Sequence, residues 1–317
     1  MLNGKGMCEI TIEHLAKDFG PVRAVEDLTF AVEPGTVTGF LGPNGAGKTT
    51  TLRCLLGLVA PTSGRARIGG ARYQDLPDPV RTVGAALEAS SFHPGRTARN
   101  HLLVMCAAGS LPDRRADEVL DLTGMTEAAD RRVGGYSTGM RQRLSLAAAL
   151  LGDPSCLVLD EPATGLDPAG INWIRLLLRH LAHDLGKTVL VSSHLLSEME
   201  HTADRVVIVS HGRLVREGSL ADIVGRSAGA VQARTPDPVR LRDALAVAGL
   251  RAEIHDGTVF VSGATTGQVG HVAFGAGVEL SELMERPTDL EDVFLELTNG
   301  GAPPGRSGEP VSAGGPQ

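Results

Sequence analysis

The residues from Gly42 to Thr50 form the part of the chain best suited to chemistry on a phosphate group. They contain the pattern Gly-x-x-x-x-Gly-Lys-Thr, which is typical of a phosphate-binding loop between a strand and a helix. In such loops glycines let backbone N–H groups converge on an anion, the lysine reaches the β- and γ-phosphates, and the threonine hydroxyl ligates Mg²⁺. We therefore predict a nucleotide site formed by Gly42, Pro43, Asn44, Gly45, Ala46, Gly47, Lys48, Thr49 and Thr50.

Two acidic residues follow an apolar run at 156–159 that has the composition of a strand buried on both faces. Asp160 is placed to hold Mg²⁺ through water, which would complete the site begun by Thr49. Glu161 is placed to orient and deprotonate an attacking water. An acidic strand end is common, but the pair in a chain with a phosphate loop indicates a catalytic site.

A second candidate anion site lies at a helix start. Ser137 and Gly139 precede a helical pattern that extends to Leu151, and a hydroxyl beside free N–H groups at a helix N-terminus binds anions. The phosphate loop has its own helix, so we expect this site to face a nucleotide on another copy of the chain. His194, just past the predicted buried strand 188–192, is a candidate donor to a γ-phosphate, although a lone histidine is more often structural.

The elements that must position these residues alternate between strands and helices. Residues 36–40, 83–87, 156–160 and 188–192 have the composition of buried strands. Helices are predicted at 171–185 and 195–202, and a hairpin is predicted from 206–209 and 213–217. This alternation predicts a parallel sheet with crossover helices. Residues 97–151 are mostly helical, with predicted caps at Thr97, Asp113 and Ser137.

The two ends of the chain have different patterns. Residues 8–33 alternate polar and apolar residues and predict an antiparallel strand pair that turns near Gly20. Phe19 lies just before that turn. Two roles fit it equally: a residue of the core, or an aromatic ring that stacks on a base. After residue 226 the pattern predicts a compact α+β module, with a hairpin around Asp256 and Gly257 and a helix at 289–297. From Thr298 onward ten of twenty residues are Gly or Pro, which predicts a disordered tail.

Composition narrows the class of protein. The chain has 317 residues, 42% of them hydrophobic, and a net charge of −7, which argues against a nucleic-acid-binding surface. The four cysteines have no metal-type spacing, and we predict reduced thiols in a cytoplasmic protein. No apolar run reaches the roughly 18 residues that a membrane span requires. Any membrane function would therefore need a partner that spans the bilayer.

The order of GPNGAGKT, YSTGMRQR, CLVLDEPATGLDP and VSSH resembles ATP-binding-cassette (ABC) ATPases over residues 8 to about 225. The resemblance implies an α/β fold of the P-loop NTPase class, with a parallel-sheet core, a helical subdomain at about 89–152 and an antiparallel β-subdomain. It also implies that two such domains associate head to tail around two ATP molecules, with Mg²⁺ as the metal. Glu161 matches the family's catalytic base, and His194 matches its γ-phosphate switch.

The resemblance implies further roles by position. Phe19 matches the aromatic residue that stacks on adenine, and Asp167 belongs to the loop that links the two sites. Ser137 and Gly139 match the signature that closes on the partner's γ-phosphate. Tyr136-Ser-Thr-Gly-Met140 departs from the usual Leu-Ser-Gly-Gly-Gln, because Thr138 adds a side chain where the family often has none.

A second departure lies between the two motifs. Glu88 stands where the family usually has Gln. A carboxylate is still able to ligate Mg²⁺, directly or through water, so we retain Glu88 as a candidate metal ligand. Its negative charge near the γ-phosphate is expected to alter coupling or turnover.

The segments ALEASSFHP, GLDPAGI and PTDLEDVFLELT resemble ATPase subunits of drug and antibiotic exporters of the ABC-2 type, which work with a separately encoded permease. The resemblance implies ATP hydrolysis coupled to export at the cytoplasmic face of the cell membrane, by a homodimer. It implies a nucleotide-binding domain at 1–225, a small module at 226–298 that resembles a regulatory or dimer-stabilising extension, and a tail at 299–317.

Two other functions remain as alternatives. A soluble ABC ATPase acting on ribosomes or nucleic acid usually has two cassettes or a long coiled-coil insertion, and the sequence has neither; its acidic charge also disfavours this reading. A regulatory module without turnover would lack the base, yet Glu161 is present.

Overall fold

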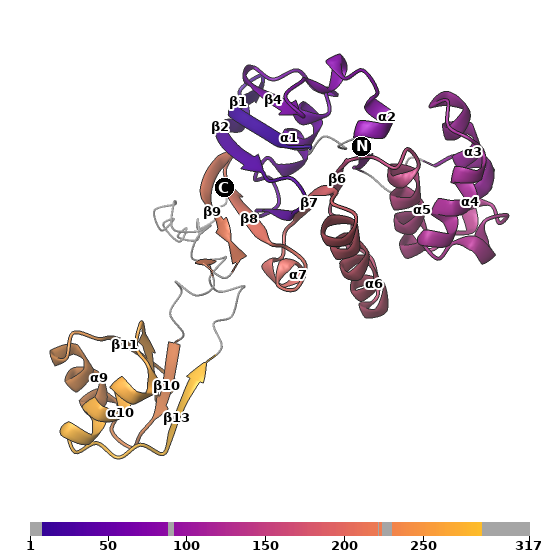
Figure 1. Ribbon diagram of the computed structural model, residues 1–317. Coiled ribbons are helices and arrows are strands. Elements are labelled where there is room, and N and C mark those ends of the chain that lie inside the picture. Colours follow the sequence, from indigo (N-terminus) through magenta and orange to yellow (C-terminus); the bar gives the residue numbers. More distant parts are fainter. Residues whose placement is uncertain (1–7, 88–91, 221, 224–229, 287–317) are drawn as a thin grey trace, which may run out of the picture.

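The computed structural model describes residues 8–87, 92–220, 222–223 and 230–286 (Figure 1). These residues form a nine-stranded sheet and a separate four-stranded sheet, each with its own helices. Three predictions lie outside the described residues: the candidate ligand Glu88, the helix at 289–297 and the tail at 299–317. The predicted domain boundaries stay predictions.

The centre of the nine-stranded sheet is parallel, as the alternation of strands and helices predicted. The strand order is β4-β1-β2-β9-β8-β3-β7-β6-β5, and β3 pairs in parallel with both β7 and β8, while β6 pairs in parallel with β5 and β7. Every residue of β3 and β7 is buried, which explains their continuous apolar composition. The central strands are β3 (Val37–Leu41), β5 (Val83–Ala86), β6 (Cys156–Asp160), β7 (Thr188–Ser193) and β8 (Arg205–Ser210).

The other side of this sheet is antiparallel. β1 pairs with β2 and β4, and β8 forms the predicted hairpin with β9. A parallel pair between Asp27 of β2 and Arg213 of β9 joins both parts into one sheet. The strands on this side are β1 (Ile10–Phe19), β2 (Val22–Val32), β4 (Ser63–Ile68) and β9 (Arg213–Ser219).

Helices cover both faces of the sheet, so its strands contribute alternate residues to two apolar cores. On one face α1 (Lys48–Leu55) packs through Leu52 and Leu55 against residues that include Phe40 and Val158. The other core contains residues of α6 (Pro168–Arg179) and of three helices that lie together in Figure 1. These three are α3 (Ala98–Ala108), α4 (Arg114–Leu122) and α5 (Thr138–Leu150), and the remaining short helices are α2 (Pro79–Thr82) and α7 (Leu196–Met199).

Some predicted helix and strand details are wrong. The helix predicted at 171–185 begins at Pro168, because Asp167 caps it, and a π-helical turn at 180–184 replaces its last part. The helix predicted at 195–202 is only α7. Asp113 precedes α4 but makes no side-chain cap bond, whereas the predicted Thr97 cap is confirmed. β5 is not fully buried, because it lies at the sheet edge and exposes Ala85.

The four-stranded sheet has the strand order β11-β12-β10-β13 and is antiparallel throughout. Its element order is strand, helix, strand, strand, helix, strand, which is the ferredoxin-like arrangement. The predicted hairpin around Asp256 and Gly257 is confirmed. The elements are β10 (Ala230–Arg234), α9 (Pro238–Val247), β11 (Arg251–His255), β12 (Thr258–Ser262), α10 (Thr266–Gly275) and β13 (Glu282–Arg286).

Two predictions concern the membrane and the thiols. Within the described ranges, no helix is long and apolar enough to cross a membrane. The four cysteines are buried and carry free thiols, as predicted. Such burial is typical of cysteines that pack as small apolar side chains.

The contact between β5 and α5 gives a test of this packing. A Cβ atom added to Gly84 would lie 2.0 Å from the backbone oxygen of Ala149, which cannot move without displacing the helix. We expect Gly84→Ala to lower the free energy of unfolding by about 1–3 kcal/mol or more, measured by denaturant unfolding.

The matched control is Gly135→Ala, because a Cβ at Gly135 meets no atom within 4 Å. This control should change the unfolding free energy little. Equal stability of the two variants would show that β5 and α5 do not pack as described.

Candidate active site

The phosphate loop connects β3 to α1, as the sequence predicted, and its glycines are required by close neighbours. Gly47 precedes α1 with φ 97°, and a Cβ atom there would lie 2.4 Å from the backbone oxygen of Ala24. A Cβ on Gly42 would lie 2.5 Å from the backbone oxygen of Val209. Strands β2 and β8 therefore hold the loop tightly at both of its ends.

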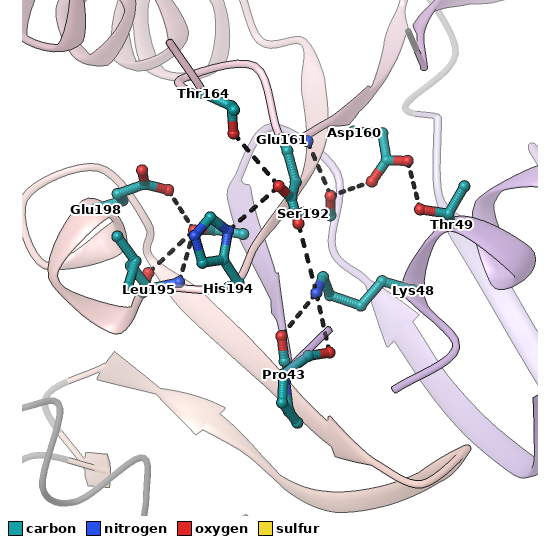
Figure 2. A network of polar contacts seen from close by, with 12 residues as sticks. Pro43, Lys48, Thr49, Asp160, Glu161, Thr164, Ser192, His194, Leu195 and Glu198 are labelled. Carbon is teal, nitrogen blue, oxygen red and sulfur yellow. Dashed lines mark hydrogen bonds and ion pairs between the residues drawn. The ribbon is translucent and has the colours of Figure 1, made fainter. Parts of the chain in front are cut away.

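Lys48 is the buried cation of this loop. Its side chain is 5% exposed, and its Nζ donates hydrogen bonds to the backbone oxygens of Gly42 at 2.6 Å and Pro43 at 3.3 Å (Figure 2). The same Nζ lies 3.6 Å from Glu161 Oε1. Burial lowers the pKa of Lys48, and the negative charges of Glu161 and Asp160 oppose that shift.

Asp160 joins three elements at the carboxyl ends of the parallel strands. The Thr49 hydroxyl at the start of α1 donates to Asp160 Oδ2 at 2.7 Å. The hydroxyl of Ser192, the register partner of Asp160 on β7, donates to Oδ1. A hydroxyl and a carboxylate held this close provide the oxygen donors that Mg²⁺ prefers, so these residues fit the predicted metal.

Glu161 follows Asp160 in a left-handed conformation, with φ 47°. This conformation is unusual for a residue other than glycine, and such strain is concentrated at functional sites. Its backbone N–H donates to Ser192 Oγ at 3.0 Å, and its Oε2 accepts a hydrogen bond from Thr164 Oγ1 at 3.3 Å. The carboxylate is therefore oriented by a neighbouring side chain as well as by the backbone.

His194 lies beside this carboxylate (Figure 2). Its Nδ1 is 3.2 Å from Glu161 Oε2, but that buried nitrogen makes no aligned hydrogen bond to any described residue. The contact is therefore a close approach of two polar groups. The structure brings the predicted residues Lys48, Thr49, Asp160, Glu161 and His194 together in one network.

The predicted signature residues lie outside the network in Figure 2. Ser137 caps α5, and its Oγ accepts the Met140 N–H at 3.2 Å, which leaves the hydroxyl proton available to another acceptor. Asp167 caps α6 in the same way, since its Oδ1 accepts the Gly170 N–H at 2.8 Å. Gly139 lies in the first turn of α5. The roles predicted for these residues in a dimer, toward the nucleotide bound by a second copy, stay predictions.

Phe19 ends β1 and is 49% exposed, and Lys17 Nζ lies 4.9 Å from the centroid of its ring. This exposure excludes the core alternative for Phe19.

Glu88, the candidate metal ligand, falls outside the described residues.

Sequence reasoning missed two polar residues of the site. Ser192 bridges the Asp160 carboxylate and the Glu161 backbone, and Thr164 contacts the Glu161 carboxylate. Ser192 lies within the VSSH segment, but only the register of β6 against β7, which the sequence does not give, places it opposite Asp160. No comparable signal in the sequence points to Thr164.

Comparison with known proteins is consistent with this geometry. A family model described as "ABC transporter" matches residues 25–164, and a model described as a domain of unknown function matches residues 229–291. The bacitracin transport ATP-binding protein BcrA of Bacillus licheniformis is 35% identical over 90% of this chain and 96% of its own length. The Nod factor export ATP-binding protein I of Paraburkholderia xenovorans is 37% identical over 91% of this chain and 96% of its own.

Solved structures show the same fold. The ATP-binding subunit of an ABC transporter superposes with a TM-score of 0.62 and 28% identity, over 68% of this chain and 92% of that one. A cassette in a dimeric post-hydrolysis state, bound to ADP and phosphate, has a TM-score of 0.60 and 25% identity, over 67% of this chain and 98% of that one. Matching motifs, fold and nearly full-length relatives establish that this chain belongs to the ATP-binding proteins of the ABC transporter family.

Proposed function

We propose that this chain is the ATP-hydrolysing subunit of an exporter that moves a drug, antibiotic or related compound through a separately encoded membrane permease. The convergence of Lys48, Thr49, Asp160 and Glu161 at one edge of the sheet is the observation that supports ATP hydrolysis most directly. Relatives named for bacitracin transport and Nod factor export support the exporter assignment. The proposed place of action is the cytoplasmic face of the cell membrane, reached through the permease.

In this proposal the loop from Gly42 to Thr50 binds the triphosphate of ATP. Lys48 is buried and held by two backbone oxygens, so it is preorganised to pair with the β- and γ-phosphates. The exposed ring of Phe19 is available to stack on adenine. The exposure of an aromatic ring is then explained by the ligand that covers it.

Thr49 and Asp160 would hold Mg²⁺, and Glu88 is a further proposed ligand. When bound, the ion supplies positive charge that stabilises the phosphate oxygens during transfer. The side chains of Thr49 and Asp160 are already adjacent at 2.7 Å, so little rearrangement would be needed to ligate one ion. The hydrogen bond from Ser192 keeps the Asp160 carboxylate oriented.

Hydrolysis requires a water to attack the γ-phosphorus while the bond to the leaving ADP breaks. Glu161 accepts the proton of that water, and Thr164 holds the carboxylate in position through Oε2. His194 lies next to this carboxylate, and in the proposal it donates a hydrogen bond to the γ-phosphate. Lys48 stabilises the charge that spreads over the phosphate oxygens.

Two copies of the chain are needed for this chemistry. Ser137 has an unused hydroxyl proton at the N-terminus of α5, where the helix dipole favours an anion. With Gly139 it would close on the γ-phosphate bound by the partner, and the loop at Asp167 would lie between the two sites. A dimeric relative bound to ADP and phosphate supports this arrangement.

Replacing Lys48 by Ala tests the phosphate loop. Charge-assisted hydrogen bonds contribute about 1.5–3 kcal/mol, so we expect ATP affinity to fall roughly ten- to a hundredfold. Equilibrium titration with ATP measures the effect, and denaturant unfolding shows whether the variant is folded. A folded variant with unchanged affinity would exclude this role of Lys48.

Replacing Glu161 by Gln tests the base. We expect turnover to fall by about 10²–10⁴-fold, because the amide cannot accept the proton. The variant should also form a stable dimer with ATP and Mg²⁺, which size-exclusion chromatography detects. The matched control is Glu127→Gln, an exposed residue outside the site, which should hydrolyse ATP normally. Near-normal turnover by Glu161→Gln would refute the assignment of the base.

A further inference from the structure

The first turn of α5 packs against the segment that follows Glu161 in the same chain. A Cβ atom added to Gly165 would lie 2.7 Å from the Cγ2 methyl of Thr138, so this methyl occupies the space beside the glycine. A Cβ added to Gly139 would lie 3.3 Å from Leu166 Cδ2. The helix start that carries the signature therefore touches the loop between the catalytic glutamate and α6.

The next turn of α5 continues this contact. Gln142 Nε2 donates to the backbone oxygens of Glu161 and Thr164, each at 3.4 Å. The guanidinium of Arg143 lies 4.0 Å from the ring centroid of Trp173 on α6. Residues 138 and 142, and likewise 139 and 143, are one helical turn apart and so project from the same side of α5. This side of α5 therefore contacts the chain at several points between Glu161 and Trp173.

Thr138 is the member of this contact that departs from the usual signature. Gly165 has φ 78°, a conformation that strongly favours glycine, so only the facing residue can supply a side chain at this point. A glycine at position 138 would leave the loop at Gly165 without that methyl. The Thr138 side chain is otherwise exposed, so it contributes little to the core.

We propose that Thr138 is a positioning residue which, through the contact of its methyl with Gly165, couples the two ATP sites of the dimer. The inference rests on the proposed function, in which Ser137 closes on the partner's nucleotide while Glu161 acts on the nucleotide of its own chain. Movement of the α5 N-terminus toward the partner's phosphate then shifts the loop that holds Glu161. Binding at one site thereby prepares hydrolysis at the other.

Three substitutions at one exposed position separate the methyl from the hydroxyl. Thr138→Val keeps the methyl, Thr138→Ser keeps only the hydroxyl, and Thr138→Gly removes both. We expect the wild type and Thr138→Val to hydrolyse ATP with a Hill coefficient above 1. For Thr138→Ser and Thr138→Gly we expect a Hill coefficient near 1 and a kcat about two- to thirtyfold lower, while ATP affinity is unchanged.

Fluorescence gives a second readout, because Trp173 is the only tryptophan of the chain and lies under Arg143 of α5. In a Glu161→Gln background, addition of ATP and Mg²⁺ should change this fluorescence. Thr138→Val should preserve the change, and Thr138→Ser should diminish it. If Thr138 only stabilised the fold, its substitutions would change the free energy of unfolding, but Thr138→Val and Thr138→Ser would show the same fluorescence response to ATP.

Several results would overturn the inference. They are equal Hill coefficients and kcat for Thr138→Ser and wild type, equal loss in Thr138→Val and Thr138→Ser, or a wild type that hydrolyses ATP with a Hill coefficient of 1. Each of these leaves ATP hydrolysis by Glu161 intact. Failure of the proposed function is distinct, since the wild type itself would then neither hydrolyse ATP nor pair.

Discussion

The Asp160 carboxylate is the group on which the rest of the site depends. It accepts one hydrogen bond from Thr49 at the start of α1 and another from Ser192 on β7. The Ser192 hydroxyl oxygen also accepts a hydrogen bond from the Glu161 N–H, so this serine links the backbone of the proposed base to the Asp160 carboxylate. Because hydrogen bonds to a charged group are about twice as strong as neutral ones, one side chain fixes three elements that lie far apart in the sequence.

Charge balance explains why the loop has this form. Two adjacent carboxylates, Asp160 and Glu161, lie near one buried ammonium group, that of Lys48. The lysine neutralises only part of their negative charge. A triphosphate would add further negative charge. The N–H groups of a glycine loop and the positive end of α1 supply compensation without another basic side chain. Close contacts at Gly42 and Gly47 leave no room for larger residues.

The parts of the site that could be predicted from sequence are those set by local pattern. Asp160 and Glu161 follow a continuous apolar run, His194 follows a predicted strand, and the carboxyl ends of parallel strands meet at one edge. Ser192 and Thr164 could not be assigned, because their roles depend on strand register and loop conformation. The early start of α6 required the Asp167 cap, and the strand order of the C-terminal sheet is not contained in the periodicity of its segments.

The described chain has two kinds of functional residue, and their burial differs for a physical reason. Lys48 and Ser192 are buried, so their polar groups must be satisfied inside one chain for the fold to be stable. Ser137, Thr138 and Phe19 are exposed, so none of them is held by the core. Ser137 also serves its own chain as the cap of α5. In the proposed dimer a nucleotide and a second copy would cover these exposed side chains, so that one chain would supply the charged half of each site and pairing the rest.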